Sequence, residues 1–168
     1  MNPMRNLRIA KVTLNFGAGK NPQLLEKGSL LLERIAGKAP VQVVTQKRVP
    51  NWGLRPGLPI GAKITVRGAK ADEIIRSALT AKEQTLTERN FDKEGNVAFG
   101  IPEYIEISGM KYDPDIGMLG FQLTITLERA GYRIKTRRLR PARVPHRHRV
   151  TKEEAMAFMK ERFGVSIQ

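Results

Sequence analysis

Residues 45–68 read TQKRVPNWGLRPGLPIGAKITVRG, a basic stretch that is rich in proline and glycine. It contains five basic residues, no acidic residue and the only tryptophan of the chain, Trp52. Its three prolines lack a backbone N–H, which argues against a helix or a central strand across residues 47–59. Strand-like runs at Val41–Gln46 and Ile60–Arg67 flank this part. The stretch therefore predicts two strands joined by a long, stiffened, cationic loop.

A connection of this length inside a compact domain is usually functional. Cations beside one large aromatic ring are typical of proteins that bind nucleic acid by charge and stacking. The alternative is a basic surface loop whose Trp52 ring packs into the core. An exposed ring favours the first interpretation, and a buried ring favours the second.

The predicted strands share one pattern, with apolar side chains on one side and polar side chains on the other. The polar set is Lys11, Thr13, Asn15, Gln42, Gln46, Lys63, Thr65, Arg67, Gln122, Thr124 and Thr126. Antiparallel sheets commonly bury one face and leave the other in water. We therefore predict an α+β fold with helices packed on one face of an antiparallel sheet, and a polar, RNA-binding face opposite. A plain solvated face is the alternative.

Helix signals surround this sheet. Asn21 as N-cap, Pro22 at the first position and Gly37 as the stop predict a helix over 22–36. An apolar stripe predicts a second helix from Ala69 to about Thr87. Thr151 and Glu154 form a capping box that starts a closing helix, which ends at Gly164.

Residues 132–149 hold eight Lys and Arg residues and no acidic one. We expect a short strand at Tyr132 and Ile134, and then an extended path because Pro141 and Pro145 exclude regular structure.

The 168 residues are expected to form one domain, 1–168, which includes this basic segment. The chain has no cysteine, no apolar run long enough to cross a membrane and no signal-peptide pattern at its N-terminus. A cytoplasmic location fits. A membrane surface would favour a basic helix with apolar anchors, not a polar sheet.

The formal net charge of +14 favours a polyanionic partner. It is unevenly distributed: residues 1–70 carry +11, residues 71–131 carry −5 and residues 132–168 carry +8. This segregation predicts a defined RNA face and a separate surface, with the acidic middle part as a candidate for protein contact.

Enzyme motifs are absent from the sequence. His146 and His148 are the only histidines, and they lie among arginines without a carboxylate nearby, so a metal site is not expected. The run Gly17–Lys20 fails the phosphate-loop pattern because Leu14 stands where its first glycine should be. We predict no cofactor and no catalytic role.

Several motifs in order carry a resemblance to a known family. They are VTLNFGAG at 12–19, GKAPVQVVTQKR at 37–48, FDKEGNVAFGIPEYI at 91–105 and YDPDIGMLGFQLTITL at 112–127, together with the stretch 45–68. The chain resembles the universal L-five family of large-subunit ribosomal proteins over nearly its whole length. It lacks the long N-terminal helix of bacterial members, and its basic 133–149 stretch looks like that of archaeal and eukaryotic members, so an archaeal type is expected.

The resemblance implies a structural role in the central protuberance of the large subunit. The family's contacts to 5S rRNA map onto Asn15, Lys38, Trp52 and Thr65, and the polar face adds Lys11, Thr13, Lys63 and Arg67. The loop that reaches towards P-site tRNA carries Lys47, Arg48 and Arg55. Further rRNA contacts are expected from the basic segment, namely Arg133, Arg137, Arg138, Arg140, Arg143, His146, Arg147 and Arg149.

The implied partners are 5S rRNA, 23S rRNA, P-site tRNA, a protein of the L-eighteen family and a small-subunit bridge protein. A free RNA chaperone or regulatory RNA-binding protein with the same fold is the alternative.

Overall fold

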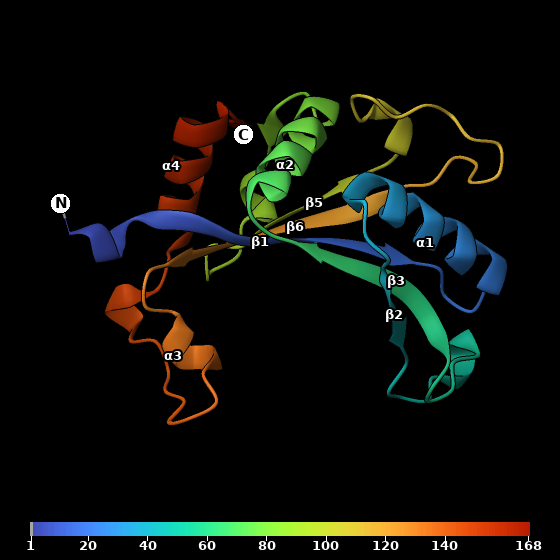
Figure 1. Ribbon diagram of the computed structural model, residues 1–168, viewed down its shortest axis with the longest axis horizontal. Coiled ribbons are helices and arrows are strands. Elements are labelled where there is room, and N and C mark those ends of the chain that lie inside the picture. Colours follow the sequence, from blue (N-terminus) through green and yellow to red (C-terminus); the bar gives the residue numbers. More distant parts are fainter. Residues whose placement is uncertain (1) are drawn as a thin grey trace.

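The central element of the computed structural model, which describes residues 2–168, is a five-stranded antiparallel sheet with strand order β2-β3-β1-β6-β5 (Figure 1). Its strands are β1 (Leu7–Gly17), β2 (Val41–Val44), β3 (Pro59–Val66), β5 (Val97–Ile101) and β6 (Phe121–Arg129). A second, two-stranded parallel sheet joins β4 (Thr85–Leu86) to β7 (Ser166–Ile167). The predicted α+β class is confirmed.

The three longer helices lie on one side of the large sheet, as Figure 1 shows. They are α1 (Pro22–Ala36), α2 (Ala69–Ala81) and α4 (Lys152–Phe163). The Asn21 side chain accepts hydrogen bonds from the first turn of α1, and Gly37 ends that helix in the left-handed conformation. The capping box of Thr151 and Glu154 and the stop at Gly164 are also present. These local signals were read correctly from sequence.

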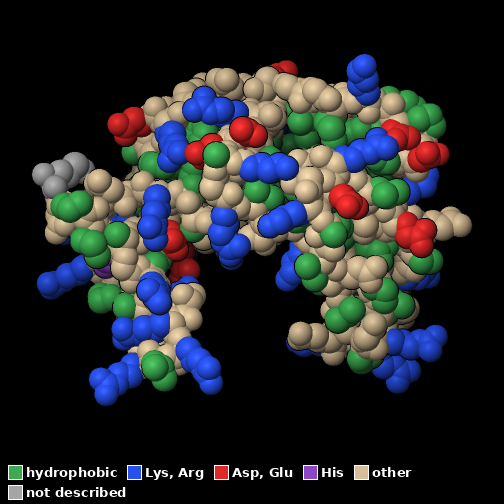
Figure 2. All heavy atoms as spheres, in the orientation of Figure 1, with side chains coloured by type: hydrophobic (Ala, Val, Ile, Leu, Met, Phe, Trp, Pro, Cys, Tyr) green, Lys and Arg blue, Asp and Glu red, His purple; other side chains and the backbone are tan. Residues whose placement is uncertain are grey.

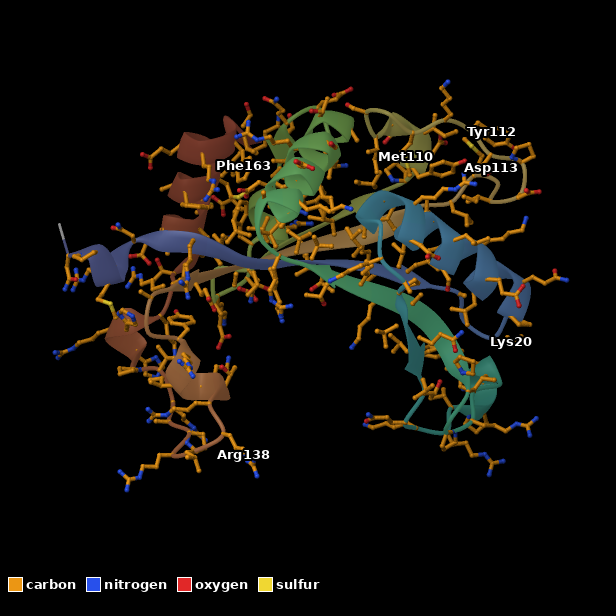
Figure 3. All side chains as sticks on the ribbon, in the orientation of Figure 1. Lys20, Met110, Tyr112, Asp113, Arg138 and Phe163 are labelled. Atoms are coloured by element: carbon orange, nitrogen blue, oxygen red, sulfur yellow. The ribbon has the colours of Figure 1, made fainter. Side chains whose placement is uncertain are left out.

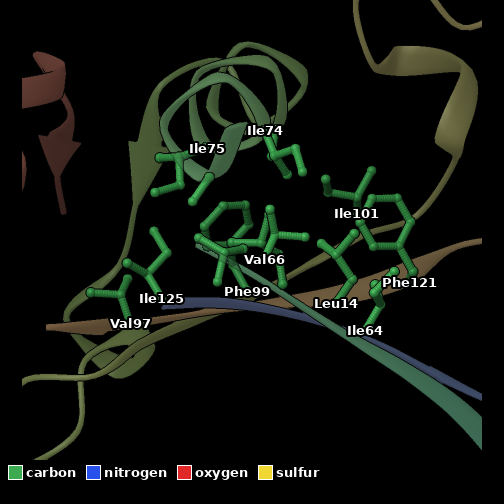
Figure 4. Packing of buried hydrophobic residues seen from close by; sticks show 14 of the residues in the cluster. Leu14, Ile64, Val66, Ile74, Ile75, Val97, Phe99, Ile101, Phe121 and Ile125 are labelled. Carbon is green, nitrogen blue, oxygen red and sulfur yellow. The ribbon is translucent and has the colours of Figure 1, made fainter. Parts of the chain in front are cut away.

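The core fills the space between these helices and the apolar side of the sheet. Figure 4 shows Ile74 and Ile75 of α2 above strand residues such as Leu14, Val66 and Ile125. Leu14 and Ile125 are fully buried, as alternation along the strands predicts. Because the core takes up one face of the sheet, the polar side chains of the same strands are left on the other.

Two predicted elements differ from the structure. Helix α2 ends at Ala81, not near Thr87, because Glu83 and Gln84 both adopt positive φ and Leu86 is buried in the small sheet. The expected strand at Tyr132 and Ile134 was wrong, since the chain forms the short helix α3 (Arg133–Thr136) there.

Two further corrections concern the region around the loop. A single 3₁₀ turn, Pro50–Trp52, lies within the stretch expected to have no helix, with Pro50 at the first position where a missing N–H is tolerated. Strand β2 stops at Val44, before Gln46, and it leaves Val41 and Val44 largely exposed. As an edge strand, it contributes little to the core.

Candidate nucleic-acid interface

The polar face of the sheet is organised in rows by the strand register. Thr13 lies opposite Thr65 on one side and Thr124 on the other. Asn15 in the same way lies between Lys63 and Gln122, and its Nδ2 donates to Gln122 Oε1 over 3.5 Å. Directly opposed residues point to the same side of a sheet. Three strands thus present adjacent hydroxyl, amide and ammonium groups to solvent.

The part of this face formed by β1 and β6 is the floor of a broad groove with a volume of about 1050 Å³, whereas Lys63 and Thr65 of β3 do not line it. Lys11, Thr13, Asn15 and Arg67, all expected at the site, line the groove. It is also lined by Gln122, Thr124 and Thr126 of β6, which belong to the predicted polar set. Figure 2 shows the hollow from the side, as the space beneath an arch with two downward projections.

The first projection is the Trp52 loop, residues 45–58, which lies at the end of β2 and β3 (Figure 1). Its base is closed by two hydrogen bonds, Thr45 N to Leu58 O and Gly57 N to Thr45 O, both 2.8 Å long. A bridge between Val49 and Leu54 narrows its tip. These bonds hold the loop away from the sheet as a defined structure.

At the tip of this loop, the Trp52 side chain is 70% exposed. The alternative in which the ring packs into the core is therefore wrong. Gly53 follows with a φ of 67°, a conformation that allows the chain to turn back directly after the ring. Lys47, Arg48 and Arg55 are exposed on the same loop. The result is a flat apolar ring presented among cations.

The second projection is the C-terminal basic segment, residues 132–149, which hangs from the opposite end of the sheet (Figures 1 and 2). Seven of its eight predicted contact residues are exposed; these are Arg133, Arg137, Arg138, Arg140, Arg143, His146 and Arg147. Arg138 lies at the far end of the projection in Figure 3. Their charges are thus available to a partner.

Two of the eight predicted contact residues, Arg137 and Arg149, also have contacts within the protein. Arg137 Nε donates to Arg140 O over 2.7 Å, and Arg149 Nε donates to Val144 O over 3.2 Å. Arg149 is half-buried and lies 4.0 Å from a Glu94 carboxylate oxygen. Arg149 therefore holds the segment in shape as well as contributing charge.

The predicted site residues do not all come together. Lys38 is exposed in the connection between α1 and β2 and does not line the groove, while Trp52 lies at the end of its loop. The interface consequently has three parts: the sheet floor, the Trp52 loop and the C-terminal basic segment.

Sequence reasoning missed Arg8 and Glu128, which line the groove and form an ion pair of 2.9 Å. Arg8 and Lys11 differ in parity along β1, so strict alternation would place them on opposite faces. A register shift between Ile9 and Lys11 brings both to the polar side. This register shift is a β-bulge that depends on pairing with β6, so no local sequence pattern could predict it.

The clearest pKa shift in the described residues lies outside this interface. The pKa of Asp113 is lowered below its usual value of 3.8, first by the hydrogen bond from Asp115 N and then by Arg34. This ion pair joins α1 to the loop that precedes β6 (Figure 3 labels Asp113). It is a structural contact between elements.

Within residues 2–168, no three His, Asp or Glu side chains gather where they could hold a metal ion. In the same residues, no helix is long and apolar enough to cross a membrane. Fold and site together define a class of protein, a basic α+β protein with an open polar sheet face between two cationic projections.

Two family models match the chain, ribosomal protein L5 over residues 2–55 and the C-terminus of the ribosomal L5 family over residues 59–158. A protein of Methanosphaera stadtmanae is 46% identical over the full length of both chains. Proteins of Sulfurisphaera tokodaii and Nanoarchaeum equitans are each 45% identical, over 99% of this chain and 95% and 98% of theirs. All three are called large ribosomal subunit protein uL5.

The chain belongs to the ribosomal protein L5 family. This is the family that the sequence motifs indicated, and the archaeal relatives agree with the expected archaeal type. The protein is therefore a structural ribosomal protein and not an enzyme.

Proposed function

We propose that this chain is a constituent of the large ribosomal subunit in the cytoplasm, where it binds 5S rRNA through the polar sheet face and its two flanking projections. The observation that carries the proposal is the row arrangement of Thr13, Asn15 and their neighbours on an open sheet face. Folded RNA offers riboses, phosphates and base edges, which hydroxyl and amide groups can contact directionally. Family membership supports 5S rRNA as the partner.

The two projections extend the proposal to further RNA. The C-terminal basic segment is suited to contact 23S rRNA, because its exposed arginines can form bidentate contacts with phosphates. Trp52 is proposed to stack on a 5S rRNA base. Lys47, Arg48 and Arg55 are proposed to face P-site tRNA, and Lys38 is proposed as a peripheral 5S rRNA contact.

We also propose that the whole chain acts as one domain with protein neighbours on its helical side. The hydrophobic core joins residues from both matched parts of the chain, such as Leu31 and Ile125. Among the acidic side chains between residues 71 and 131, Asp92, Glu94 and Glu128 line the groove, so we propose the remaining ones as the docking surface for an L-eighteen-type protein or a small-subunit bridge protein.

Direct titration of 5S rRNA tests the RNA assignment. The wild-type chain should bind 5S rRNA more tightly than a duplex RNA of equal length, and an Asn15→Ala/Thr124→Ala double variant should weaken that binding. A Ser77→Ala/Thr80→Ala variant on α2 is the matched control, since Ser77 and Thr80 lie on the helical side. An equal loss of 5S rRNA affinity in both variants, or no preference for 5S rRNA over the duplex, contradicts the proposal.

Sedimentation distinguishes a ribosomal constituent from a free RNA chaperone. The chain should be present at one copy per large subunit after a high-salt wash. A mostly free, substoichiometric pool would instead favour the chaperone.

The tRNA assignment has its own test. Arg48→Ala and Arg55→Ala should leave 5S rRNA affinity unchanged and lower P-site tRNA occupancy. If they face 5S rRNA instead, the salt dependence of 5S rRNA binding should fall by roughly 0.7–0.9 in log–log slope for each lost phosphate contact.

A further inference from the structure

A small cavity lies at the root of the C-terminal basic segment, separate from the floor of the groove. Its volume is about 290 Å³, close to the lower end of the range of about 300–1000 Å³ typical of small-molecule sites. Tyr132, Pro141, Ala142 and Val144 supply its apolar wall. Lys135, Arg143 and Arg149 supply cationic groups, and Glu94 supplies one carboxylate. The cavity can accept one small, partly apolar and anionic group, and it is too small for a helix.

The cavity is formed by contacts within the protein. The Tyr132 hydroxyl accepts a hydrogen bond from Val150 N over 3.0 Å and donates to His148 O over 3.2 Å. Ala142 N donates to Ile134 O over 3.0 Å, which folds the far side of the segment back onto α3. The walls are therefore held in place by the chain's own bonds.

Three cationic side chains and one carboxylate line the cavity, so its net charge is positive. Among residues 2–168, Lys135 and Arg143 have no acidic partner within ion-pair distance, and Arg149 has only the distant contact to Glu94. A cationic rim over an apolar wall suits a phosphate joined to a flat, weakly polar ring. A nucleotide has this combination.

The position of the cavity indicates where that nucleotide would come from. Tyr132 and Lys135 line both the cavity and the 1050 Å³ groove on the sheet face, so the two spaces adjoin. RNA-binding proteins commonly read unstacked bases by placing them against aromatic rings and guanidinium groups. A strand crossing the groove could turn one base into this cavity.

We propose that the cavity between Tyr132, Ala142 and Arg143 receives a single unstacked nucleotide of the RNA bound on the sheet face. The proposal rests on the proposed function, because the groove must hold RNA for a strand to reach the cavity. The apolar wall contacts the base, and Lys135 and Arg143 contact the phosphate.

Nuclear magnetic resonance on the full chain tests the cavity directly, with the methyl signals of Ala142 and Val144 as reporters. Adenosine, guanosine, cytidine and uridine 5′-monophosphates are titrated separately, and inorganic phosphate is the comparison. At least one nucleotide should shift both methyl signals in a saturable way and more tightly than phosphate. Unmoved signals, or identical shifts with phosphate alone, would overturn the proposal.

Variants assign the binding to the cavity. Ala142→Trp should fill the cavity and weaken nucleotide binding, followed by the Val144 methyl signals alone, by roughly tenfold, the order expected when one stacked base is lost. Arg143→Ala changes an exposed residue, so it should keep the fold, and it should weaken binding severalfold. Leu139→Ala is the control, because Leu139 lies in the same segment but does not line the cavity. Equal binding by Arg143→Ala and the control would contradict the assignment.

Nucleotide and 5S rRNA titrations of the wild-type chain separate this proposal from the proposed function. If the wild-type chain binds 5S rRNA while nucleotides leave the methyl signals unmoved, only the cavity proposal fails. If nucleotides bind in the cavity but 5S rRNA is not bound, the proposed function fails.

Discussion

At the residue scale, the environment of Trp52 distinguishes most clearly between a side chain that binds a partner and one that packs in the core. Its large apolar ring is exposed at a loop tip that is closed by backbone hydrogen bonds. Exposed rings contribute little to folding, whereas a ring stacked on a base contributes to binding. The loop therefore leaves the apolar surface of the ring in water, and a bound partner would cover it.

Trp52→Ala should weaken 5S rRNA binding by about 1–3 kcal/mol if the ring stacks on a base. The free energy of unfolding should change by less than about 0.5 kcal/mol, because the substitution is at the surface. Filter binding and urea unfolding measure the two quantities. Trp52→Phe keeps a ring and should retain most of the affinity. A large loss of stability with unchanged affinity would contradict the stacking role.

Asp113 gives a second prediction at this scale. Its lowered pKa means that the ionised carboxylate stabilises the folded state above the usual pKa of 3.8, which the unfolded chain keeps, and that this contribution is lost as pH falls through the lower folded pKa. Asp113→Asn should therefore reduce stability at pH 7 by more than at pH 3. Urea unfolding at both pH values measures the difference. An equal effect at both would mean that the charge does not matter.

At the scale of elements, α1 packs on β1 through a glycine. A Cβ atom built on Gly28 would lie 2.1 Å from Cδ1 of Phe16, far closer than two carbon atoms can approach. The helix consequently sits directly over the Phe16 ring, and its separation from the sheet is set by a missing side chain. This contact fixes the strand that carries Thr13 and Asn15.

Gly28→Ala should lower the free energy of unfolding by about 1–3 kcal/mol through overpacking, even though alanine favours helices. Gly100→Ala is the matched control, since a Cβ atom there meets nothing within 4 Å. The control should be neutral or stabilise by up to about 1 kcal/mol. Thermal and urea unfolding of both variants measure this, and a stabilised Gly28→Ala chain would contradict the packing account.

Elements were predictable from sequence where their signals are local. The ends of α1 and α4 follow from caps and glycines adjacent to each helix. The end of α2 was missed because Leu86 pairs with Ile167, a partner far away in the chain. Helix α3 was missed because the hydrogen bonds of Tyr132 to residues near 150 shape that segment. Where an element depends on contacts with distant parts of the chain, local sequence patterns do not predict its type or its ends.

At the scale of the whole molecule, the distribution of charge and polarity matches the architecture. The helices and core occupy one side of the sheet, and the polar rows, the Trp52 loop and the C-terminal basic segment occupy the other (Figures 1 and 2). Alternation along the strands predicted the polar floor. The depth of the groove above that floor was not predictable, because tertiary contacts position the two projections that enclose it.

Site-specific crosslinking tests which face meets RNA. A photoreactive benzoylphenylalanine replaces Thr124 on the polar face or, as the control, Thr80 on the helical face. After irradiation with 5S rRNA, the Thr124 position should crosslink strongly and the Thr80 position should not. Strong crosslinking from Thr80, with none from Thr124, would place the RNA on the wrong side of the sheet and contradict the central claim.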